Sequence, residues 1–359
     1  MVDEATKITL NLVQKTTNIS AEGADPAVVF LKGAIPASLA EFSSRALHDV
    51  LTVHEALELG KTVGADVRPI KGTRGVVGAL AAVGAELCHK DHSFEIIAYR
   101  TRTNLGKPRQ VDSESVRKVE SDYGDQTFHN LDVETGRILI CPHGPDPVLL
   151  GIRGTTANSV REAFEHITTR EPIERVAIFR TNQGTDAHIK RTRSVSTLRP
   201  YQSTVIDGRV ETIPRILKGG HVVFRLADNT GTADCVAFRQ SGPMMRISRD
   251  LLPGDRIRAS GGIRRRENGQ LSLNLEKIEI VNLAQSYRYR NSTCPLCEGH
   301  CESMGNQQGY RCRKCGLRLG DKDKIRTLET RSIAASSYIP PERSRRHLTR
   351  PIRQMRTVS

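Results

Sequence analysis

The sequence has no tryptophan, few other aromatic residues, and no long run of apolar residues. Aromatic residues make up 4% of the 359 residues, and the mean hydropathy is −0.40. A membrane-spanning helix needs about 20 consecutive apolar residues, so we expect no membrane partner. Residues 1–10 also lack the charged region, apolar stretch and small-residue cleavage site of a secretory signal, which predicts a cytoplasmic protein.

Acidic residues are also in short supply. The chain has 54 Lys and Arg against 40 Asp and Glu, which gives a net charge of +14 and a pI near 9.6. Such a balance says little about fold, but it makes a polyanion the first partner to test. Beyond Gly316, 11 basic residues stand against 4 acidic ones. For residues 321–359 we therefore expect a mobile basic tail that lies along phosphates, with an ordinary disordered, solvated segment as the alternative.

Cysteine is rare outside one cluster, because five of the eight cysteines lie between residues 294 and 315. Two CxxC pairs, Cys294 with Cys297 and Cys312 with Cys315, are separated by 14 residues, just short of the usual zinc-ribbon spacing. Four thiolates on two facing turns make the tetrahedral sulfur shell that Zn²⁺ prefers, and the ion would supply most of the folding energy of residues 290–320. Reduced surface thiols or a redox pair are the alternative, and Cys301 is a spare.

Residues 1–92 contain a glycine-rich loop that follows two predicted helices. The second helix is expected at 53–59, with Thr52 as its N-cap and Gly60 at its end. The loop then leads into an apolar, small-residue helix, and the residues that carry the pattern are Lys71, Gly72, Thr73, Arg74, Gly75 and Gly78. Backbone N–H groups at such a helix N-terminus favour a phosphate. Close packing of a glycine-rich helix is the alternative.

Residues 93–190 alternate strands and helices in an order compatible with a ferredoxin-like βαββαβ layer. A polar helix is expected at 113–123, and Ser159 with Glu162 predicts a capping box for the next one. The loop after the last strand gathers side chains suited to a cationic or hydrogen-bonding ligand: Asn182, Gln183, Thr185, Asp186 and His188. A satisfied turn between domains is the alternative for this loop.

Residues 200–283 have the clearest β pattern, with the strand order of an OB-fold and a short helix between the third and fourth strands. The fourth strand carries arginines of one parity, which strand geometry directs to one face: Arg256, Arg258, Arg264 and Arg266. We expect this face to bind RNA, with solubility as the alternative. The apolar parity of the last strand changes after Leu275, which predicts a bulge near Glu276 or Lys277.

Three segments carry the resemblance to a known family. Residues 72–81 (GTRGVVGALA), 142–154 (PHGPDPVLLGIRG) and 179–188 (FRTNQGTDAH), followed by an OB-fold and a zinc ribbon, resemble the archaeal tRNA-isoleucine 2-agmatinylcytidine synthetases, the TiaS family. The resemblance implies an α+β multidomain protein. Its parts are the C-terminal portion of a kinase-like ATP domain in 1–92, a ferredoxin-like domain in 93–190, an OB-fold in 200–283, a zinc ribbon in 290–320 and a basic tail in 321–359.

The resemblance also implies a ligase that uses ATP and Mg²⁺ to modify tRNA. C2 of the wobble cytidine of an isoleucine tRNA with a CAU anticodon would be phosphorylated, and the amine of agmatine would then displace the phosphate. A carbonyl oxygen leaves poorly until it is phosphorylated, and phosphoryl transfer depends mainly on positioning and charge neutralisation. Residues 72–78, with Lys71 and Arg74, are expected to hold the ATP phosphates. From their chemistry, residues 182–188 are expected near agmatine or the cytidine, with Asp186 pairing with a cationic amine.

One feature of the family is not found in this sequence. Family members begin with a segment that carries a Gly-Ile-Asp-Asp-Thr-Asp-like motif and a later Lys-Thr-Arg-Gly-Asn-like element, and neither occurs here. The acidic residues expected to hold Mg²⁺ are therefore not among these residues, and no catalytic residue is assigned. A catalytically incomplete protein that binds tRNA or single-stranded nucleic acid is the alternative function.

Overall fold

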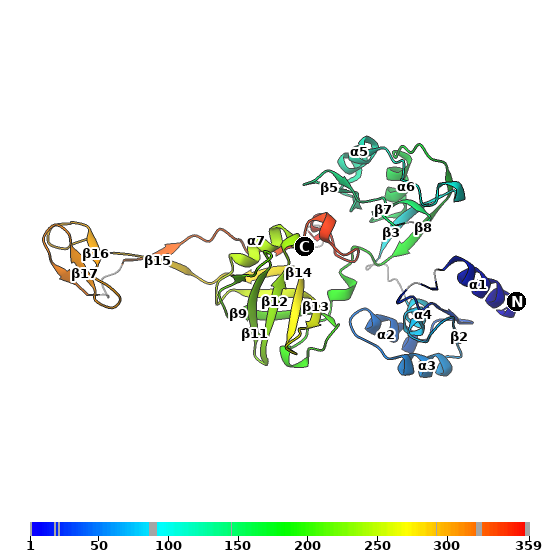
Figure 1. Ribbon diagram of the computed structural model, residues 1–359, viewed down its shortest axis with the longest axis horizontal. Helices are drawn as coiled ribbons and strands as arrows, with labels where there is room; N and C mark the ends of the chain where they lie inside the picture. Colours follow the sequence, from blue (N-terminus) through cyan, green and yellow to red (C-terminus); the bar gives the residue numbers. More distant parts are fainter. Residues whose placement is uncertain are drawn as a thin grey trace.

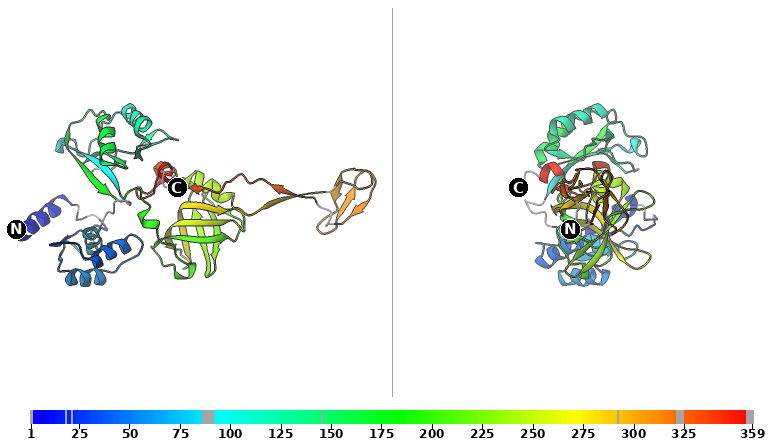
Figure 2. Two further views of the ribbon diagram at one scale, coloured as in Figure 1. Left: turned by 180° about the vertical axis from the view of Figure 1, so that it is seen from behind. Right: turned by 90° about the vertical axis from the view of Figure 1, so that its left-hand side faces the viewer.

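The protein is elongated and consists of successive units along the chain (Figure 1). This computed structural model describes residues 2–17, 19–20, 22–85, 92–144, 146–291, 293–320 and 325–355. Two units lie at one end of the molecule, a β-barrel lies in the middle, and a small cysteine-rich unit projects from the other end on a two-stranded arm (Figure 2). Within the described residues, no helix has the length and apolar character needed to cross a membrane.

The N-terminal unit packs helices against a two-stranded antiparallel sheet. Its elements are α1 (Val2–Thr16), β1 (Ala27–Phe30), α2 (Ala37–Ala46), α3 (Val53–Thr62), β2 (Asp66–Pro69) and α4 (Gly75–Val83). Thr52 caps α3 by accepting the Glu55 N–H, as predicted. The predicted end of this helix is wrong, because Gly60 lies inside it. Gly60 is buried where an added Cβ would come within 3.0 Å of the Val67 side chain, so the glycine permits close packing rather than ending the helix.

The second unit, called the sheet unit here, has a four-stranded antiparallel sheet in the order β4-β7-β3-β8. Its elements are β3 (Ser93–Arg100), η1 (Arg102–Asn104), α5 (Ser113–Tyr123), β4 (Thr127–Phe128), β5 (Leu131–Asp132), β6 (Arg137–Ile138), β7 (Val148–Gly154), α6 (Ala157–Glu165), β8 (Ile173–Thr181) and η2 (Ala187–Ile189). Helix α5 has the predicted bounds. The predicted capping box is wrong: α6 begins three residues earlier than expected, and Thr156 and Ser159 bond to each other's backbone N–H groups.

The barrel has the strand order predicted for an OB-fold, and pairing of β9 with both β11 and β13 closes it. Its elements are η3 (Val195–Thr197), β9 (Ser203–Val210), β10 (Arg215–Ile216), β11 (Val222–Asp228), β12 (Gly231–Ala237), η4 (Arg239–Ser241), α7 (Pro243–Arg249), β13 (Arg256–Arg265) and β14 (Leu271–Asn282). The predicted bulge is present. Ser260 pairs with Lys277 and Gly261 with Leu275, so Glu276 is the extra residue. Bulges of this kind let a strand bend around a small barrel.

The arm and the cysteine-rich unit follow the barrel. The arm is formed by β15 (Ser286–Arg290) and β19 (Ile325–Glu329), and the unit at its tip contains β16 (Cys301–Ser303), β17 (Tyr310–Cys312) and β18 (Arg318–Leu319). Its buried cluster contains three cysteines and one tyrosine, Cys294, Cys301, Cys312 and Tyr310. Such a core is too small to fold alone.

The C-terminal tail, residues 330–355, is folded, so the expectation of a mobile basic arm is wrong for these residues. It contains β20 (Ser337–Tyr338), η6 (Glu342–Ser344) and α8 (Ile352–Met355), and β20 adds to β14 of the barrel. Ile333 and Ile339 are buried, and Arg343 forms an ion pair with the fully buried Asp132 of the sheet unit. These apolar anchors and paired arginines hold the tail between the two units (Figure 1). Residues 321–324 and 356–359 of the predicted tail lie outside the described residues.

Candidate functional site

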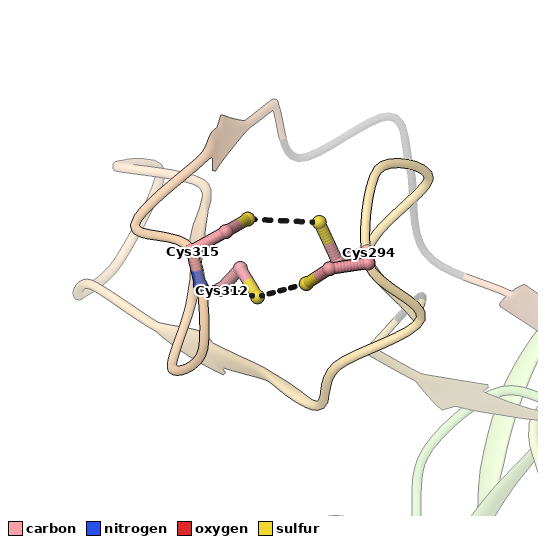
Figure 3. Close-up of side chains that lie close together, drawn as sticks. Cys294, Cys312 and Cys315 are labelled. Carbon is pink, nitrogen blue, oxygen red and sulfur yellow. Dashed lines mark hydrogen bonds between the residues drawn. The ribbon is translucent and has the colours of Figure 1, made fainter.

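The four predicted cysteine ligands meet at the tip of the arm (Figure 3). The Sγ atoms of Cys294, Cys297, Cys312 and Cys315 all lie within 4.8 Å of one another. The distance is 3.4 Å between Cys294 and Cys315, and 3.5 Å between Cys297 and Cys312. Zinc–sulfur bonds of about 2.3 Å place tetrahedral ligands about 3.8 Å apart. The sulfur cage therefore fits Zn²⁺.

Backbone N–H groups prepare one of these sulfurs to bind metal. Cys315 and Lys314 direct their N–H groups at Cys312 Sγ, at 3.5 and 3.3 Å, and these bonds lower the pKa of Cys312 to about 6. The thiolate is the form that ligates zinc. Cys301 is fully buried but lies outside the cage, with its sulfur 3.9 Å from the Gly299 carbonyl oxygen.

The glycine-rich loop leads into helix α4 as predicted, but the carboxylate of Asp25 already accepts hydrogen bonds from two of its backbone N–H groups. Asp25 accepts the Gly72 N–H at 2.8 Å and the Arg74 N–H at 2.9 Å. The side chains of Lys71 and Arg74 donate to the carbonyl oxygens of Ile19 and Gly23. This loop therefore holds a segment of its own chain, and the expected phosphate contacts at Gly72 and Arg74 stay a prediction.

Two other glycines of the loop differ in their surroundings. A Cβ added to Gly75 would lie 1.7 Å from the Asp25 carbonyl oxygen, so Gly75 is needed for close packing. Gly78 is exposed and has no heavy atom within 4 Å of such a position. Close packing of a glycine-rich helix, the alternative to phosphate binding, therefore accounts for Gly75. Thr73 is exposed at the loop surface.

The predicted ligand loop at 182–188 is a junction between units. Asp186 accepts the Lys277 Nζ of the barrel at 3.1 Å and the Arg350 N–H of the tail at 2.7 Å. His188 Nε2 lies 2.7 Å from Glu276 Oε2, and the His188 carbonyl oxygen lies 3.1 Å from His48 Nδ1 of the N-terminal unit. Both carboxylate oxygens of Asp186 are thus engaged. Lys277 thus supplies one cationic amine to Asp186, and contact of Asp186 with agmatine stays a prediction. The loop joins units as the alternative expected, but it is not fully satisfied, because the buried Gln183 Oε1 and His188 Nδ1 have no hydrogen-bond partner among the described residues.

The other polar residues of this loop also bond within the protein. Gln183 donates to Glu95 Oε2 at 2.8 Å, and the Thr185 hydroxyl donates to the Asn182 carbonyl oxygen at 2.6 Å. Glu95 in turn pairs with Arg153 at 2.8 Å, and both side chains are largely buried. These contacts fix the loop on the sheet face that the tail covers.

The four predicted RNA-binding arginines do not form one continuous surface. Arg256 and Arg258 lie beside Asp207 at 3.3 and 3.4 Å, and Arg258 also pairs with Glu279. Arg266 pairs with Asp234 at 3.1 Å, and the Arg264 guanidinium lies 5.4 Å from the ring centre of Tyr201. Between the two pairs, Ser260 and Gly262 are buried, with Gly262 close to Glu276 and Arg346. The four arginines therefore form two separate pairs, most of whose charges have acidic neighbours, and their binding of RNA stays a prediction.

Several organising residues carry no local sequence signal. Arg109 donates to the carbonyl oxygens of Pro142, Gly144, Asp146 and Val148, and so shapes the loop at 142–147, of which residue 145 lies outside the described residues. Asp25 and Asp49 likewise act on partners 47 to 153 positions away. Only the fold brings these groups together, so spacing in the sequence could not have marked them.

Comparison with protein families gives three matches. The TiaS FLD domain matches residues 73–188, the OB-fold nucleic acid binding domain matches residues 204–281, and the TiaS C-terminal zinc ribbon domain matches residues 291–333. These matches follow the order of the sheet unit, the barrel and the cysteine cage. They confirm the predicted OB-fold and zinc ribbon.

Relatives and solved structures match nearly the whole chain. The TiaS enzymes of Thermococcus sibiricus and Methanosarcina mazei, named tRNA-isoleucine 2-agmatinylcytidine synthetases, are each 37% identical to it over 96% and 95% of this chain and 79% of their own length. A crystal structure of TiaS with isoleucine tRNA and ATP superimposes with a TM-score of 0.86 at 33% identity, covering 98% of this chain and 81% of that one. A complex of TiaS with tRNA, an ATP analogue and agmatine gives a TM-score of 0.83 at 32% identity, with 98% and 82% covered.

The closed barrel, the sulfur cage and the family matches define a multidomain nucleic-acid-binding protein with a zinc ribbon. Relatives that are 37% identical match almost the whole chain over about four fifths of their own length. The chain belongs to the TiaS family, the tRNA-isoleucine 2-agmatinylcytidine synthetases.

Proposed function

We propose that the protein is an ATP-dependent ligase that joins agmatine to C2 of the wobble cytidine of an isoleucine tRNA with a CAU anticodon. The observation that carries this proposal is the match over nearly the whole chain to enzymes named for that product. Related structures hold tRNA, ATP and agmatine, which supports the same three partners here. The relatives do not favour the alternative of a binding protein without turnover.

The chemistry proceeds in two steps. The γ-phosphoryl group of ATP is transferred to the C2 oxygen of the cytidine, with Mg²⁺ neutralising the phosphate charges. The primary amine of agmatine then attacks C2, and the oxygen leaves as inorganic phosphate while the amine loses a proton to solvent. The new C2–N bond thus replaces the C2–O bond. No catalytic residue is assigned within this chain.

The domain roles follow the family. We assign residues 1–92 to the C-terminal portion of a kinase-like ATP domain, and residues 93–190 to a ferredoxin-like domain. The antiparallel order β4-β7-β3-β8, with α5 and α6 as crossovers, supports the second assignment. The OB-fold (200–283) and the ribbon (290–320) hold tRNA, with Cys294, Cys297, Cys312 and Cys315 as ligands of one structural Zn²⁺. The protein is assigned to the cytoplasm, where tRNA is used.

The phosphate-binding role of the glycine-rich loop is restricted by its contacts. A phosphate could reach the Gly72 and Arg74 N–H groups only by displacing Asp25. The exposed Thr73 remains the loop residue we place beside the nucleotide. Five residues remain candidate contacts of agmatine or the cytidine, although most of their polar groups already bond within the protein: Asn182, Gln183, Thr185, Asp186 and His188.

Transfer of labelled agmatine tests the proposal. The purified chain, ATP, Mg²⁺ and labelled agmatine are incubated with an isoleucine tRNA transcript, and label in the tRNA is counted. We expect label only when ATP is present, and none in a matched transcript whose wobble cytidine is replaced by uridine. Equal label in the two transcripts, or binding of tRNA with no label transferred, would overturn the proposed ligase.

A further inference from the structure

A cationic cleft lies where the N-terminal unit meets the segment that leads into the barrel. The cleft has a volume of about 380 Å³. Arg45 and Asp49 line it from the N-terminal unit, and Arg191, Arg193 and Arg199 line it from the connecting segment. These residues are up to 154 positions apart in the sequence, and none belongs to a predicted site.

Positive charge in this cleft exceeds negative charge. Asp49 is the one carboxylate of the lining, and it accepts Arg193 Nη2 at 2.6 Å and Arg191 Nη1 at 3.3 Å. Arg45 pairs with Glu55, just outside the cleft, at 2.6 Å. Arg199 is exposed, and no carboxylate in the described part of the chain forms an ion pair with it.

Asp49 also makes the cleft rigid. Besides two arginines, it accepts the Gln202 side-chain amide at 2.8 Å, while Gln202 accepts the Arg199 N–H at 2.8 Å. The carboxylate therefore ties the N-terminal unit to the start of the barrel. The guanidinium groups of Arg191 and Arg199 remain accessible beside this anchor. Guanidinium groups are well suited to phosphate oxygens, because they present a planar fork of donors.

An exposed aromatic ring belongs to Tyr201, the residue between Pro200 and Gln202, which both line the cleft. Tyr201 is 66% exposed, and its backbone has a positive φ of 69°, an unusual conformation for a bulky residue. The Tyr201 N–H donates to the Ile263 carbonyl oxygen at 2.8 Å, and Arg264 lies 5.4 Å from the ring centre. Strained backbone of this kind persists where the surroundings hold it, and often marks a functional position. The ring is thus exposed to solvent and lies near the cation of Arg264.

We propose that this cleft binds the phosphodiester backbone of the substrate RNA, and that an unpaired base stacks on Tyr201. Arginines that hold phosphates beside an aromatic ring that accepts a base are the usual features of a single-stranded nucleic-acid site. The inference rests on the proposed function in taking RNA as the substrate. It places Arg191 and Arg199 ahead of the arginines at 256, 258 and 266 as phosphate contacts. The cleft offers one carboxylate, Asp49, to Arg191 and Arg193 and none to Arg199, whereas Asp207, Glu279 and Asp234 pair with the other three.

The salt dependence of tRNA binding tests the phosphate contacts. Each lost phosphate contact reduces the slope of log affinity against log salt by about one. The Arg191→Ala/Arg199→Ala variant should flatten the slope by about two. The matched control Arg256→Ala/Arg258→Ala removes the same charge from β13 and should change the slope by less than one. An unchanged slope in the cleft variant, or an equal change in the control, would overturn the proposal.

Two further measurements separate the possible failures. The affinity for ATP, titrated without tRNA, should be the same in the cleft variant and the unmodified protein. A loss of ATP affinity with an unchanged salt slope for tRNA would show that the cleft holds free nucleotide. That result would overturn the proposal. Agmatine transfer by the unmodified protein reports on the proposed function alone. If that transfer failed, the ligase would be rejected, while the slopes would still decide on the cleft.

A tryptophan probe tests the stacking contact. Because the chain contains no tryptophan, the Tyr201→Trp variant has a single indole fluorophore. We expect its emission to be quenched as tRNA is added, since a stacked base is in contact with the ring. The Ile213→Trp variant, at a 69% exposed position beyond the opposite end of β9, is the control and should change little. Absence of quenching in the first variant, or equal quenching in both, would refute stacking on residue 201.

Discussion

Burial controls the protonation of His129 in the sheet unit. The side chain is 8% exposed, and this burial lowers the pKa of His129 to about 3, with the positive charges of Arg345, Arg153 and His347 acting in the same direction. In the unfolded chain a histidine has a pKa near 6.5. Between about pH 3 and pH 6.5 His129 carries a proton in the unfolded chain but not in the folded protein. The stability that neutral His129 contributes is therefore complete above about pH 6.5 and is lost as the pH falls towards 3.

The pH dependence of unfolding tests this account of His129. From pH 7 to pH 5, His129 should lower the free energy of unfolding of the sheet unit by about 2 kcal/mol. The His129→Asn variant should lose that pH dependence, since asparagine does not titrate and tolerates the positive φ of 58° at this position. Denaturant unfolding at pH 7 and pH 5 measures this change in the free energy of unfolding. The exposed His54→Asn on α3 serves as the control; if the His129 variant kept the same pH dependence as this control, the assignment would be wrong.

Single residues also show where sequence reasoning stops. The four cage cysteines could be predicted because two short, regular spacings carry the whole signal. The partners of Asp186 could not be predicted from its loop, because Lys277, which forms an ion pair with it, and Arg350, whose backbone N–H donates to it, are 91 and 164 positions away. Asp25, which binds the glycine-rich loop from a distant position, is a similar case. A polar side chain is a candidate ligand only until its partners within the fold are known.

At the scale of elements, helix α4 contains two glycines with opposite roles. An alanine at residue 75 would place its Cβ 1.7 Å from the Asp25 carbonyl oxygen, whereas residue 78 has open space. We expect Gly75→Ala to destabilise the N-terminal unit by about 1–3 kcal/mol, the usual cost of overpacking. Gly78→Ala should instead stabilise it by about 0.5–1 kcal/mol, because alanine restricts the unfolded chain. Thermal unfolding of both variants checks the signs; the same sign in both would contradict the packing described here.

The ribbon depends on its metal more than on its core. Removing one ligand with Cys312→Ser should reduce bound zinc from about one ion per chain to nearly none and make residues 291–320 sensitive to protease, because the ion supplies most of the folding energy. Cys301→Ala removes a buried sulfur outside the cage, and zinc should remain. Elemental analysis of both variants measures this. Full zinc retention by the Cys312 variant would show that the cage is not the zinc site.

Elements with strong local signals were predicted well. The bounds of α5, the order of the barrel strands and the bulge at Glu276 all follow from periodicity and turn residues. The end of α3 and the cap of α6 were misplaced, because tertiary packing at Gly60 and a reciprocal pair at Thr156 outweighed the local pattern. The basic tail was the largest error. Its charge predicted a mobile arm along phosphates, yet two buried isoleucines and the ion pair of Arg343 with the buried Asp132 fix it.

At the scale of the whole molecule, the tail joins the barrel to the sheet unit. Strand β20 pairs with β14 of the barrel, and the carbonyl oxygens of His347 and Leu348 accept the N–H groups of Gly184 and Asp186, each at 2.8 Å. The tail therefore fixes the junction loop from one side, while His48 contacts it from another. These contacts hold the barrel, the sheet unit and the N-terminal unit in one arrangement.

The ion pair of Arg343 with Asp132 should be important for this arrangement. Asp132 is fully buried, so Arg343→Ala leaves a carboxylate with fewer donors, at a cost of about 1–3 kcal/mol. We expect faster proteolytic cleavage within residues 331–350. The control Arg313→Ala breaks an exposed pair with Glu302 and should leave the cleavage rate nearly unchanged. Equal cleavage rates for the two variants would indicate that the tail does not depend on this pair.

The mass of the anticodon-loop fragment tests the ligase assignment most directly. Isoleucine tRNA is incubated with the protein, ATP, Mg²⁺ and agmatine, and then digested and weighed. The account predicts that the wobble cytidine gains the mass of one agmatine less one water, and that every other nucleotide keeps its mass. A fragment of unchanged mass from tRNA that the protein demonstrably binds would contradict it.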